Sequence, residues 1–401
     1  MERNSGQGIA KSPSQSFFRR LSAHRSHCAR ARKRSVGSPS IFLTQASTSR
    51  RIRRSMSEWV KVEADELIAQ SLARRACGGN APSATAFFPA PRSKPPILSR
   101  TRSTFADQRS FFTAMLMLHD PRCADYGASG HPEQPVRITK TVPFLRETHP
   151  DWRWQTPPES VSDETLLLAH TRAHLKRLEE PSDFDPDTAY FPNIATHARR
   201  AAASAVAAAD HALRRSEPAF SLMRPPGHHA TAHEAMGFCY LNHVAIAALH
   251  ALTQSAIARV AVWDFDAHHG NGTEALVLGR PGCLFTSVHQ SPGYPGTGLE
   301  DVSNCRNWPL PPHTPRIRHM GALRESFDAV LNFQPDLILV SAGFDAYVRD
   351  PITAMTLENE DFATLGAWLR EAAIPAAAVL EGGYSPDLPE LIDAFLNAWN
   401  G

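Results

Sequence analysis

The sequence predicts an α/β fold with a largely parallel sheet and helices on both of its faces. Apolar, strand-like runs alternate with helix-like patterns from about residue 115 to the C-terminus, which is typical of repeated strand–helix–strand units. Each apolar run also ends in polar or glycine-rich sequence, and sites in open α/β sheets gather at the carboxyl ends of strands. Without internal repeats, residues 115–401 are expected to form one domain.

The individual elements follow from the apolar runs and the residues that bound them. An Ala-rich helix ends at Arg214 and Arg215, where cations interact favourably with the helix dipole. Prolines between residues 130 and 135 exclude a helix interior there, and residues 181–193 form a polar loop. Strands are predicted over residues 114–118, 219–223, 259–265, 283–288, 336–341 and 376–380, and helices near 162–169 and 171–178 and over 197–215, 237–252, 319–332, 358–372 and 389–398.

Length and composition favour a folded domain in a reducing compartment. Of the 401 residues, 42% are apolar, which is enough for a sizeable core. The six cysteines include no C-x-x-C pair, so we expect reduced thiols rather than a disulfide scaffold. No apolar run approaches the roughly 20 residues that span a membrane, and no secretory signal follows the start. We therefore expect a cytoplasmic protein without a membrane partner.

Residues 1–114 differ from the rest of the chain. They contain 21 Lys+Arg against 6 Asp+Glu, whereas residues 115–401 contain 21 against 34. Such a segment buries too little apolar surface to offset its ordering entropy, so we expect a mostly disordered basic extension with, at most, a short helix near 58–76. It is a disordered tail, an organelle transit peptide, or an upstream extension of a chain that starts at Met115 or Met117.

The charge distribution also bears on nucleic acid. Docking of the basic segment on nucleic acid is an open hypothesis, because clustered Lys and Arg bind phosphates. The acidic remainder of the chain argues against nucleic acid as the partner of the domain itself.

The most informative stretch runs from residue 260 to residue 272. Its apolar start predicts a buried strand of the parallel type, and carboxylates, two histidines and a glycine turn follow. Alternate residues of a strand share a face, so Asp264, Asp266 and His268 are candidates for one site, with Trp263 and Phe265 in packing. Carboxylate oxygen and imidazole nitrogen suit zinc. The alternative is a helix cap or a polar turn.

The other predicted strands end in residues of the same chemical kinds. A doubly wound sheet brings these ends to one rim, so together they predict a site, although each end alone is compatible with an ordinary turn. The residues are His228 and His229 after 219–223, His289 after 283–288, Gly343, Phe344 and Asp345 after 336–341, and Glu381, Gly382, Gly383 and Tyr384 after 376–380.

These motifs make the chain resemble the histone deacetylase superfamily, which includes class II deacetylases, acetylpolyamine amidohydrolases and acetoin-utilisation proteins. The resemblance implies the arginase-deacetylase fold, a single domain with a largely parallel sheet of about eight strands flanked by helices. It extends from about Gly130 to the C-terminus. The matching runs are 224–230 (RPPGHHA), 236–242 (MGFCYLN), 264–272 (DFDAHHGNG), 294–298 (YPGTG), 341–346 (SAGFDA) and 381–384 (EGGY).

The resemblance implies one catalytic Zn²⁺ ion with three protein ligands and an open position. Two carboxylates and one imidazole leave the ion near neutral, so it would polarise a carbonyl and a water together. The ligands implied are Asp266, His268 and Asp345. A structural K⁺ site, built partly from main-chain oxygens, is implied at Asp264, Asp266, His268 and Ser287.

The resemblance also implies the catalytic side chains. His229 would be the general base on the zinc-activated water, with His228 as its electrostatic partner. Asp264 would accept a hydrogen bond from His228 and fix its tautomer. Asn271 stands where many class I relatives carry Asp, and a neutral partner should keep His229 less basic. Tyr384 would donate a hydrogen bond to the oxyanion.

Three further residues match the family's substrate tunnel. Phe238 and Tyr294 would form two aromatic walls around an aliphatic stem, and Gly237 would keep one wall open to the substrate backbone. The alternative for both aromatic residues is ordinary core packing.

The function implied is zinc-dependent removal of acetyl or other acyl groups from N-acetyl-lysine in histone-like or other proteins. The alternatives are a deacetylase of acetylpolyamines or other small N-acetyl amines, and a catalytically silent reader of acyl-lysine. An arginase-type ureohydrolase is disfavoured, because His269 and Asn271 leave a second metal without anionic ligands. A homo-oligomer is plausible.

Overall fold

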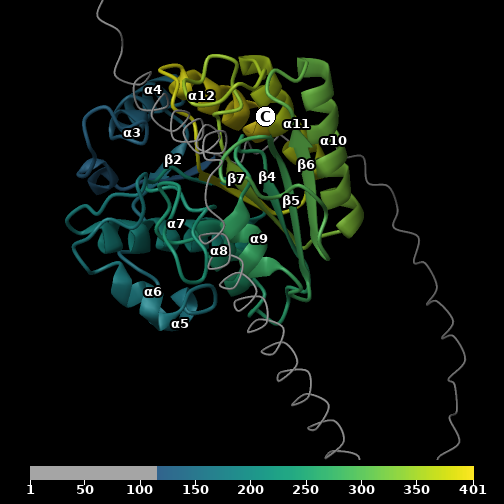
Figure 1. Cartoon of the computed structure of the whole chain (residues 1–401). Helices are drawn as coiled ribbons and strands as arrows, with labels where there is room; N and C mark the ends of the chain where they lie inside the picture. The colour runs from purple at the N-terminus through teal and green to yellow at the C-terminus, as the bar shows by residue number, and fades with distance from the viewer. Residues whose placement is uncertain (1–114) are drawn as a thin grey trace, which may run out of the picture. The chain divides into compact units, whose positions relative to one another are not determined.

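The computed structural model describes residues 115–401 (Figure 1). The expectations for residues 1–114, namely the disordered basic extension, the helix near 58–76 and the transit segment, lie outside the described residues.

Eight strands form one sheet in the order β2-β1-β3-β8-β7-β4-β5-β6, and every pairing is parallel. The expected parallel sheet of about eight strands is therefore confirmed. The strands are β1 (Leu116–Leu118), β2 (Arg153–Gln155), β3 (Ala219–Ser221), β4 (Val260–Asp264), β5 (Cys283–Gln290), β6 (Cys305–Leu310), β7 (Leu337–Ala342) and β8 (Ala376–Leu380).

Helices cover both faces of the sheet, as expected (Figure 1). On one face, α7 contacts β1, β3, β7 and β8, and α8 contacts β4 and β7; on the other, α10 contacts β4, β5 and β6, and α11 packs on α12. The helices are η1 (Pro121–Ala124), α3 (Val136–Thr139), α4 (Thr141–Thr148), α5 (Asp163–Leu166), α6 (Arg172–Arg177), α7 (Ile194–Arg215), α8 (His243–Ala251), α9 (Asn271–Val277), α10 (Arg316–Phe333), α11 (Asn359–Ala372) and α12 (Leu388–Asn400).

Strand β4 is buried on both faces, which explains its unbroken apolar sequence. Val260 and Val262 belong to the apolar layer under α7 and α8, whereas Ala261 and Trp263 belong to the layer under α10, α11 and α12. Phe265 continues the second layer just beyond the strand. Trp263 and Phe265 therefore lie in packing, as predicted.

The helix predicted over 237–252 begins six residues later, at His243. Gly237 and Phe238 have φ values of 57° and 69°, which a right-handed helix does not accommodate. The helix starts after Asn242, because the Asn242 side chain accepts a hydrogen bond from the Ala245 N–H at 3.0 Å.

The sequence did not reveal the two edge strands or four short helices, η1, α3, α4 and α9. β2 has three residues, and its two ends are exposed, so it shows no apolar run. β6 contains Pro309, which argues against a central strand but is tolerated at a sheet edge. The short helices α3, α4 and α9 carry too few turns to display a helical period.

Candidate metal and catalytic site

The predicted catalytic and metal-ligating residues lie at the ends of four strands or in the segments that follow them. These strands, β3, β8, β7 and β4, are neighbours in the sheet. Asp264 in β4 pairs in register with Ser341 in β7, and Ser341 pairs with Val379 in β8. The loops that leave these strands therefore begin at the same edge of the sheet.

A buried cluster of three side chains lies at this edge. The candidate ligand atoms of Asp266, His268 and Asp345 are all within 4.8 Å of one another. His268 Nδ1 lies 3.1 Å from Asp266 Oδ1 and 2.9 Å from Asp345 Oδ2. Both carboxylates are fully buried. The three side chains could hold one metal ion.

The cluster does not arise from strand alternation, and that part of the prediction was wrong. β4 ends at Asp264, so Asp266 and His268 lie beyond it. Asp264 Oδ1 instead accepts from the Asp266 N–H at 3.1 Å, and Asp266 Oδ1 accepts from the His268 N–H at 2.9 Å. These bonds reach the residue two positions on, as in Asx turns. The Ala267 N–H donates to Asp345 Oδ1 at 2.8 Å and joins this turn to the loop after β7.

The charges of the cluster fit a divalent cation. Burial and the neighbouring charge of Asp266 raise the pKa of Asp345 above its usual value. Burial alone would also raise the pKa of Asp266, but the charges of His228 and His268 hold it below its usual range. Two buried carboxylates favour a nearby cation, and oxygen and nitrogen donors suit zinc. The residues present therefore fit the expected Zn²⁺ ion.

His228 is held as a cation by carboxylates. Its Nδ1 lies 3.0 Å from Asp264 Oδ2, and its Nε2 lies 3.8 Å from Asp266 Oδ1. Burial would lower the pKa of His228, but the charges of Asp266 and Asp264 outweigh it and raise the pKa to about 10. The expected contact between His228 and Asp264 is present.

His229 is the neutral member of the histidine pair. Burial lowers its pKa well below the usual value, and the charges of His228 and His268 add to this effect. Its Nδ1 lies 2.8 Å from Asn271 Oδ1. An amide oxygen only accepts, so His229 donates from Nδ1 and keeps a lone pair on Nε2. The two rings lie 4.0 Å apart between centroids.

Tyr384 stands beside the cluster on the loop after β8. Burial raises the pKa of its phenol well above the usual value, so the hydroxyl remains a donor at physiological pH. The Arg137 guanidinium lies over its ring, 4.9 Å from the centroid. The Phe238 ring packs edge-on against it at 6.0 Å.

The two aromatic residues predicted as tunnel walls flank the site. Tyr294 packs edge-on against His229 at 5.0 Å between ring centroids and is 37% exposed. Phe238 contacts the ring of His131 at 4.6 Å in addition to Tyr384. Gly237 lies between His229 and Tyr294, because a Cβ there would be 2.5 Å from His229 Cδ2 and 2.8 Å from Tyr294 Cε1.

The four residues predicted to form a K⁺ site are close in the fold. Ser287 in β5 pairs in register with Asp264, and its Oγ lies 2.9 Å from His289 Nδ1. Asp266 and His268 follow Asp264 in the turn described above. The K⁺ site itself stays a prediction.

One residue beneath the histidine pair was named at its strand end without a role. Glu381 is fully buried, and its Oε2 accepts from the N–H groups of Gly227 at 2.6 Å and His228 at 3.1 Å. Burial raises its pKa to about 7. Its position at the end of a strand marked Glu381 in the sequence, but the hydrogen bonds to the histidine loop depend on the fold.

Arg137 and Asp350 were also missed, although they hold the loop of Tyr384. Arg137 Nε donates to the Gly383 carbonyl at 2.7 Å, and the Tyr384 N–H donates to Asp350 Oδ2 at 2.8 Å. Neither residue stands at a strand end, and no local pattern distinguishes it.

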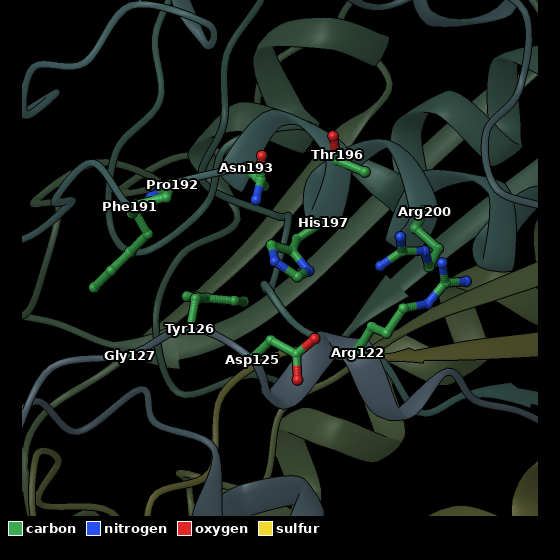
Figure 2. Close-up of a pocket in the computed structure, with 10 residues that line it drawn as sticks. All are labelled: Arg122, Asp125, Tyr126, Gly127, Phe191, Pro192, Asn193, Thr196, His197 and Arg200. Carbon is green, nitrogen blue, oxygen red and sulfur yellow. The ribbon is translucent and has the colours of Figure 1, made fainter.

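A cavity of about 470 Å³ lies beside the start of α7, and none of the predicted site residues lines it (Figure 2). Arg122 and Arg200 converge on one side of this cavity (Figure 2). Their guanidinium groups already bind the carboxylates of Asp120 and Glu159. The charges of both arginines are thus paired with carboxylates, although Arg200 Nη1 has no hydrogen-bond partner among residues 115–401.

Among residues 115–401, none of the helices combines the length and the apolar character needed to cross a membrane.

Comparison with known proteins identifies the family. The model of the histone deacetylase domain matches residues 131–399. The chain is 35% identical over 288 residues to a probable deacetylase of Methanothermobacter thermautotrophicus, which covers 68% of this chain and 86% of that protein. It is 37% identical over 283 residues to a histone deacetylase-like amidohydrolase of Pseudomonas aeruginosa, covering 64% and 73%.

Two further similarities bear on location and substrate. Histone deacetylase 14, chloroplastic, of Arabidopsis thaliana is 32% identical over 301 residues, covering 65% of this chain and 70% of that protein. The crystal structure of an acetylpolyamine aminohydrolase from Burkholderia pseudomallei superposes with a TM-score of 0.63 at 26% identity, covering 72% of this chain and 99% of that chain. The resemblance and the fold expected from it are confirmed: this chain belongs to the histone deacetylase family and is a hydrolase that acts on amide bonds.

Proposed function

We propose that this chain is a zinc-dependent deacetylase that hydrolyses N-acetyl-lysine, or a closely related acyl-lysine, in proteins. The observation that carries the proposal is the buried Asp266–His268–Asp345 cluster at one sheet edge together with a neutral histidine, His229, and a protonated phenol, Tyr384. Family membership implies an acetylated substrate.

Asp266, His268 and Asp345 would hold the zinc ion. When bound, zinc polarises an amide carbonyl and lowers the pKa of water, which provides the nucleophile at neutral pH. The turn bonds from Asp264 and Asp266 hold the backbone of Asp266 and His268, and the contact from Ala267 holds the Asp345 carboxylate. Preorganisation of this kind keeps the ligand geometry within narrow limits.

His229 is the general base of the proposed mechanism. It is neutral at physiological pH, and the bond from Nδ1 to Asn271 leaves the Nε2 lone pair to accept a proton from the attacking water. The charged His228, 4.0 Å away, makes the protonated form of His229 costly. A proton taken by His229 is therefore readily passed on to the leaving amine.

Tyr384 and His228 would stabilise the negative charge that develops on the amide oxygen. The phenol of Tyr384 stays protonated because of its burial, so it can donate to this oxygen. His228 carries a positive charge maintained by Asp264 and Asp266. The charge is fixed before the reaction, so little reorganisation is needed when the oxyanion forms.

Phe238, Tyr294 and Gly237 would hold the aliphatic part of the substrate. Tyr294 is 37% exposed and packs against the proposed base His229, which supports a position at the surface of the site. Two aromatic faces favour an alkyl chain without selecting the group at its far end.

A small N-acetyl amine is the second candidate substrate. The specific observation in its favour is the similarity to the acetylpolyamine aminohydrolase structure, which covers 99% of that chain. An acetylpolyamine presents the same alkyl stem and acetamide as acetyl-lysine.

The cytoplasm is the proposed location, with organelle import as the alternative. The alternative is supported by the chloroplastic relative from Arabidopsis thaliana and by the basic residues 1–114. Fluorescence microscopy of the full chain fused at its C-terminus to a fluorescent protein would separate the two.

Acetate release by the zinc-loaded full chain tests the proposed activity. We expect turnover of an acetyl-lysine peptide that falls by about 100- to 1000-fold in Tyr384→Phe, because that variant removes one donor to the oxyanion. Parallel assays with N-acetylputrescine rank the two substrate classes. Tyr384→Phe should keep the zinc content and melting temperature of the wild type, which separates lost chemistry from lost folding.

Zinc binding is tested independently of activity. We expect one zinc per chain by mass spectrometry of the native protein and a large loss of zinc affinity in Asp345→Ala, since a ligand is removed. Zinc binding without turnover of any acetylated amine would contradict the proposed deacetylase activity. Unchanged zinc affinity in Asp345→Ala would contradict the proposed ligand set.

A further inference from the structure

The peptide group that joins Gly383 to Tyr384 is held at both of its polar atoms. Its carbonyl accepts from Arg137 Nε at 2.7 Å, and its N–H donates to Asp350 Oδ2 at 2.8 Å. A peptide group is planar, so two bonds on opposite sides fix the orientation of the plane. This orientation sets the direction in which the Tyr384 side chain leaves the backbone.

Asp350 is itself rigidly placed. It is 7% exposed, and its Oδ1 accepts from the Ile352 N–H at 3.0 Å, while its own N–H donates to the Tyr347 carbonyl at 3.0 Å. Both carboxylate oxygens are thus used by backbone N–H groups. Because the Ile352 backbone holds the Asp350 carboxylate, Asp350 is a fixed acceptor for the Tyr384 N–H.

Asp350 also connects two loops that carry different parts of the site. It belongs to the loop after β7 (residues 343–358), which begins two residues before Asp345. Tyr384 belongs to the loop after β8 (residues 381–387). The bond between Asp350 and Tyr384 therefore fixes the phenol relative to a proposed zinc ligand.

The loop of Tyr384 needs such a restraint. Gly383 has a φ of 116°, a conformation open to glycine, and glycine moves between conformations more freely than other residues. Without the Asp350 acceptor, the Tyr384 N–H would be an unpaired donor near the protein interior. The peptide would then rotate to find another partner, and the phenol would move with it.

We propose that Asp350 is a positioning residue for the reaction: it holds the Tyr384 phenol in the place where the phenol donates to the developing oxyanion. The inference rests on the proposed deacetylase function. Asp350 does not touch the substrate, and its whole effect on rate passes through the Tyr384 hydroxyl. Its contribution therefore cannot exceed that of the hydroxyl, about 100- to 1000-fold.

A double-mutant cycle distinguishes this role from a merely structural one. Four zinc-loaded full-length proteins are compared: wild type, Asp350→Asn, Tyr384→Phe and the double variant. Asn keeps the shape of Asp350 but has one acceptor oxygen for two N–H groups. We expect Asp350→Asn to lower kcat by about 10- to 100-fold with KM changed by less than about threefold, because an interaction of the transition state is weakened.

The decisive comparison is made in the background that lacks the hydroxyl. We expect Asp350→Asn to lower kcat by less than about twofold when Tyr384 is already Phe, because the group it positions is gone. An equal fold-loss in both backgrounds, or no loss in the wild-type background, overturns the proposal. No turnover by the wild type on any acetylated amine instead overturns the proposed function, and the two failures are thereby distinguishable.

Asp387→Asn is the matched control. Asp387 bridges the same two loops, since its Oδ2 accepts from Tyr347 Oη at 3.3 Å and Arg349 Nε at 3.1 Å. It makes no hydrogen bond to the Gly383–Tyr384 peptide, so we expect kcat to fall by less than about threefold. If Asp350→Asn does not fold, Asp350→Glu replaces it in the cycle, because Glu keeps both oxygens but moves them by one methylene. Failure of both variants to fold overturns the proposal in favour of a structural role.

Discussion

At the scale of single residues, two adjacent histidines differ in charge because their partners differ. His228 faces two buried carboxylates, Asp264 and Asp266, which raise its pKa to about 10. His229 faces the neutral Asn271, and burial lowers its pKa well below the usual value. The two adjacent rings therefore differ in their affinity for a proton, in opposite directions from the usual value.

Replacement of Asn271, the neutral partner of His229, by Asp should change the pH dependence of the reaction. In Asn271→Asp, a carboxylate would lie near 2.8 Å from His229 Nδ1 and raise the pKa of His229. Because the base acts only when unprotonated, the acid limb of kcat/KM should move to higher pH by about one unit or more. The measurement is kcat/KM from pH 5.5 to 9.

Asn359→Asp serves as the control for this prediction. Asn359 is the first residue of α11, where a negative charge suits the helix dipole, and the substitution adds the same charge far from His229 in the sequence. An acid limb that stays in place in Asn271→Asp, or that moves equally in the control, would contradict the assignment of His229 as base.

At the scale of elements, the start of α8 is tied to the histidine loop by Asn242. Its Oδ1 accepts from the Ala245 N–H at 3.0 Å. Its Nδ2 donates to the Ala230 carbonyl and to Thr273 Oγ1, both at 3.1 Å. One fully buried side chain thus caps one helix, contacts another and supports the loop that carries His228 and His229.

Removal of the Asn242 side chain should lower the free energy of unfolding by more than the loss of an ordinary helix cap. Asn242→Ala loses the cap, worth about 1 kcal/mol, and leaves buried polar groups unpaired at about 1–3 kcal/mol. We expect urea unfolding to give a free energy of unfolding lower by about 2–4 kcal/mol. Ser162→Ala, which removes the exposed cap of the short helix α5, should cost less than about 1 kcal/mol. Equal losses in the two variants would refute the wider role of Asn242.

At the scale of the whole molecule, buried neutral histidines set the acid sensitivity of folding. Burial lowers the pKa of His243 and His319 to about 4 and that of His170 and His289 to about 3. The unfolded chain binds protons at these residues below about pH 6.5, where the folded chain does not. Stability is therefore full above pH 6.5 and is lost as the pH falls toward the folded-state values.

His319→Leu tests this at a site remote from the chemistry. His319 lies in α10, is fully buried, and has no hydrogen-bond partner for either ring nitrogen among the described residues. Between pH 6.5 and 4 we expect the variant to lose less stability than the wild type, by up to about 3 kcal/mol, since one histidine contributes about 1.4 kcal/mol per pH unit. Urea unfolding at several pH values measures the slope. An unchanged slope in His319→Leu would be contrary to the prediction.

The sequence predicted the central strands of the sheet better than the edge strands and the helix ends. The strands around residues 260–265 and 376–380 were evident because central parallel strands are buried on both faces and hence uninterruptedly apolar. The edge strand β6 was missed because an edge strand tolerates Pro309 and polar residues. The late start of α8 was missed because the positive φ of Phe238 depends on contacts such as its N–H bond to Thr188, 50 residues earlier in the chain.

By itself, the sequence determined the fold class, the family and the residues that end each strand. These are local properties. An apolar run indicates a buried strand, and the polar residues that follow it lie at the carboxyl edge of the sheet, where sites in parallel sheets are found. Only the tertiary structure decided how those residues act on one another. Each of these interactions connects separate loops or elements. They are the hydrogen bond of Ala267, between Asp266 and His268, to Asp345, the contacts of His228 with Asp264 and of His229 with Asn271, and the hydrogen bond between Asp350 and Tyr384. Burial and the distances between such loops are set by tertiary packing, so they cannot be derived from any single segment of the sequence.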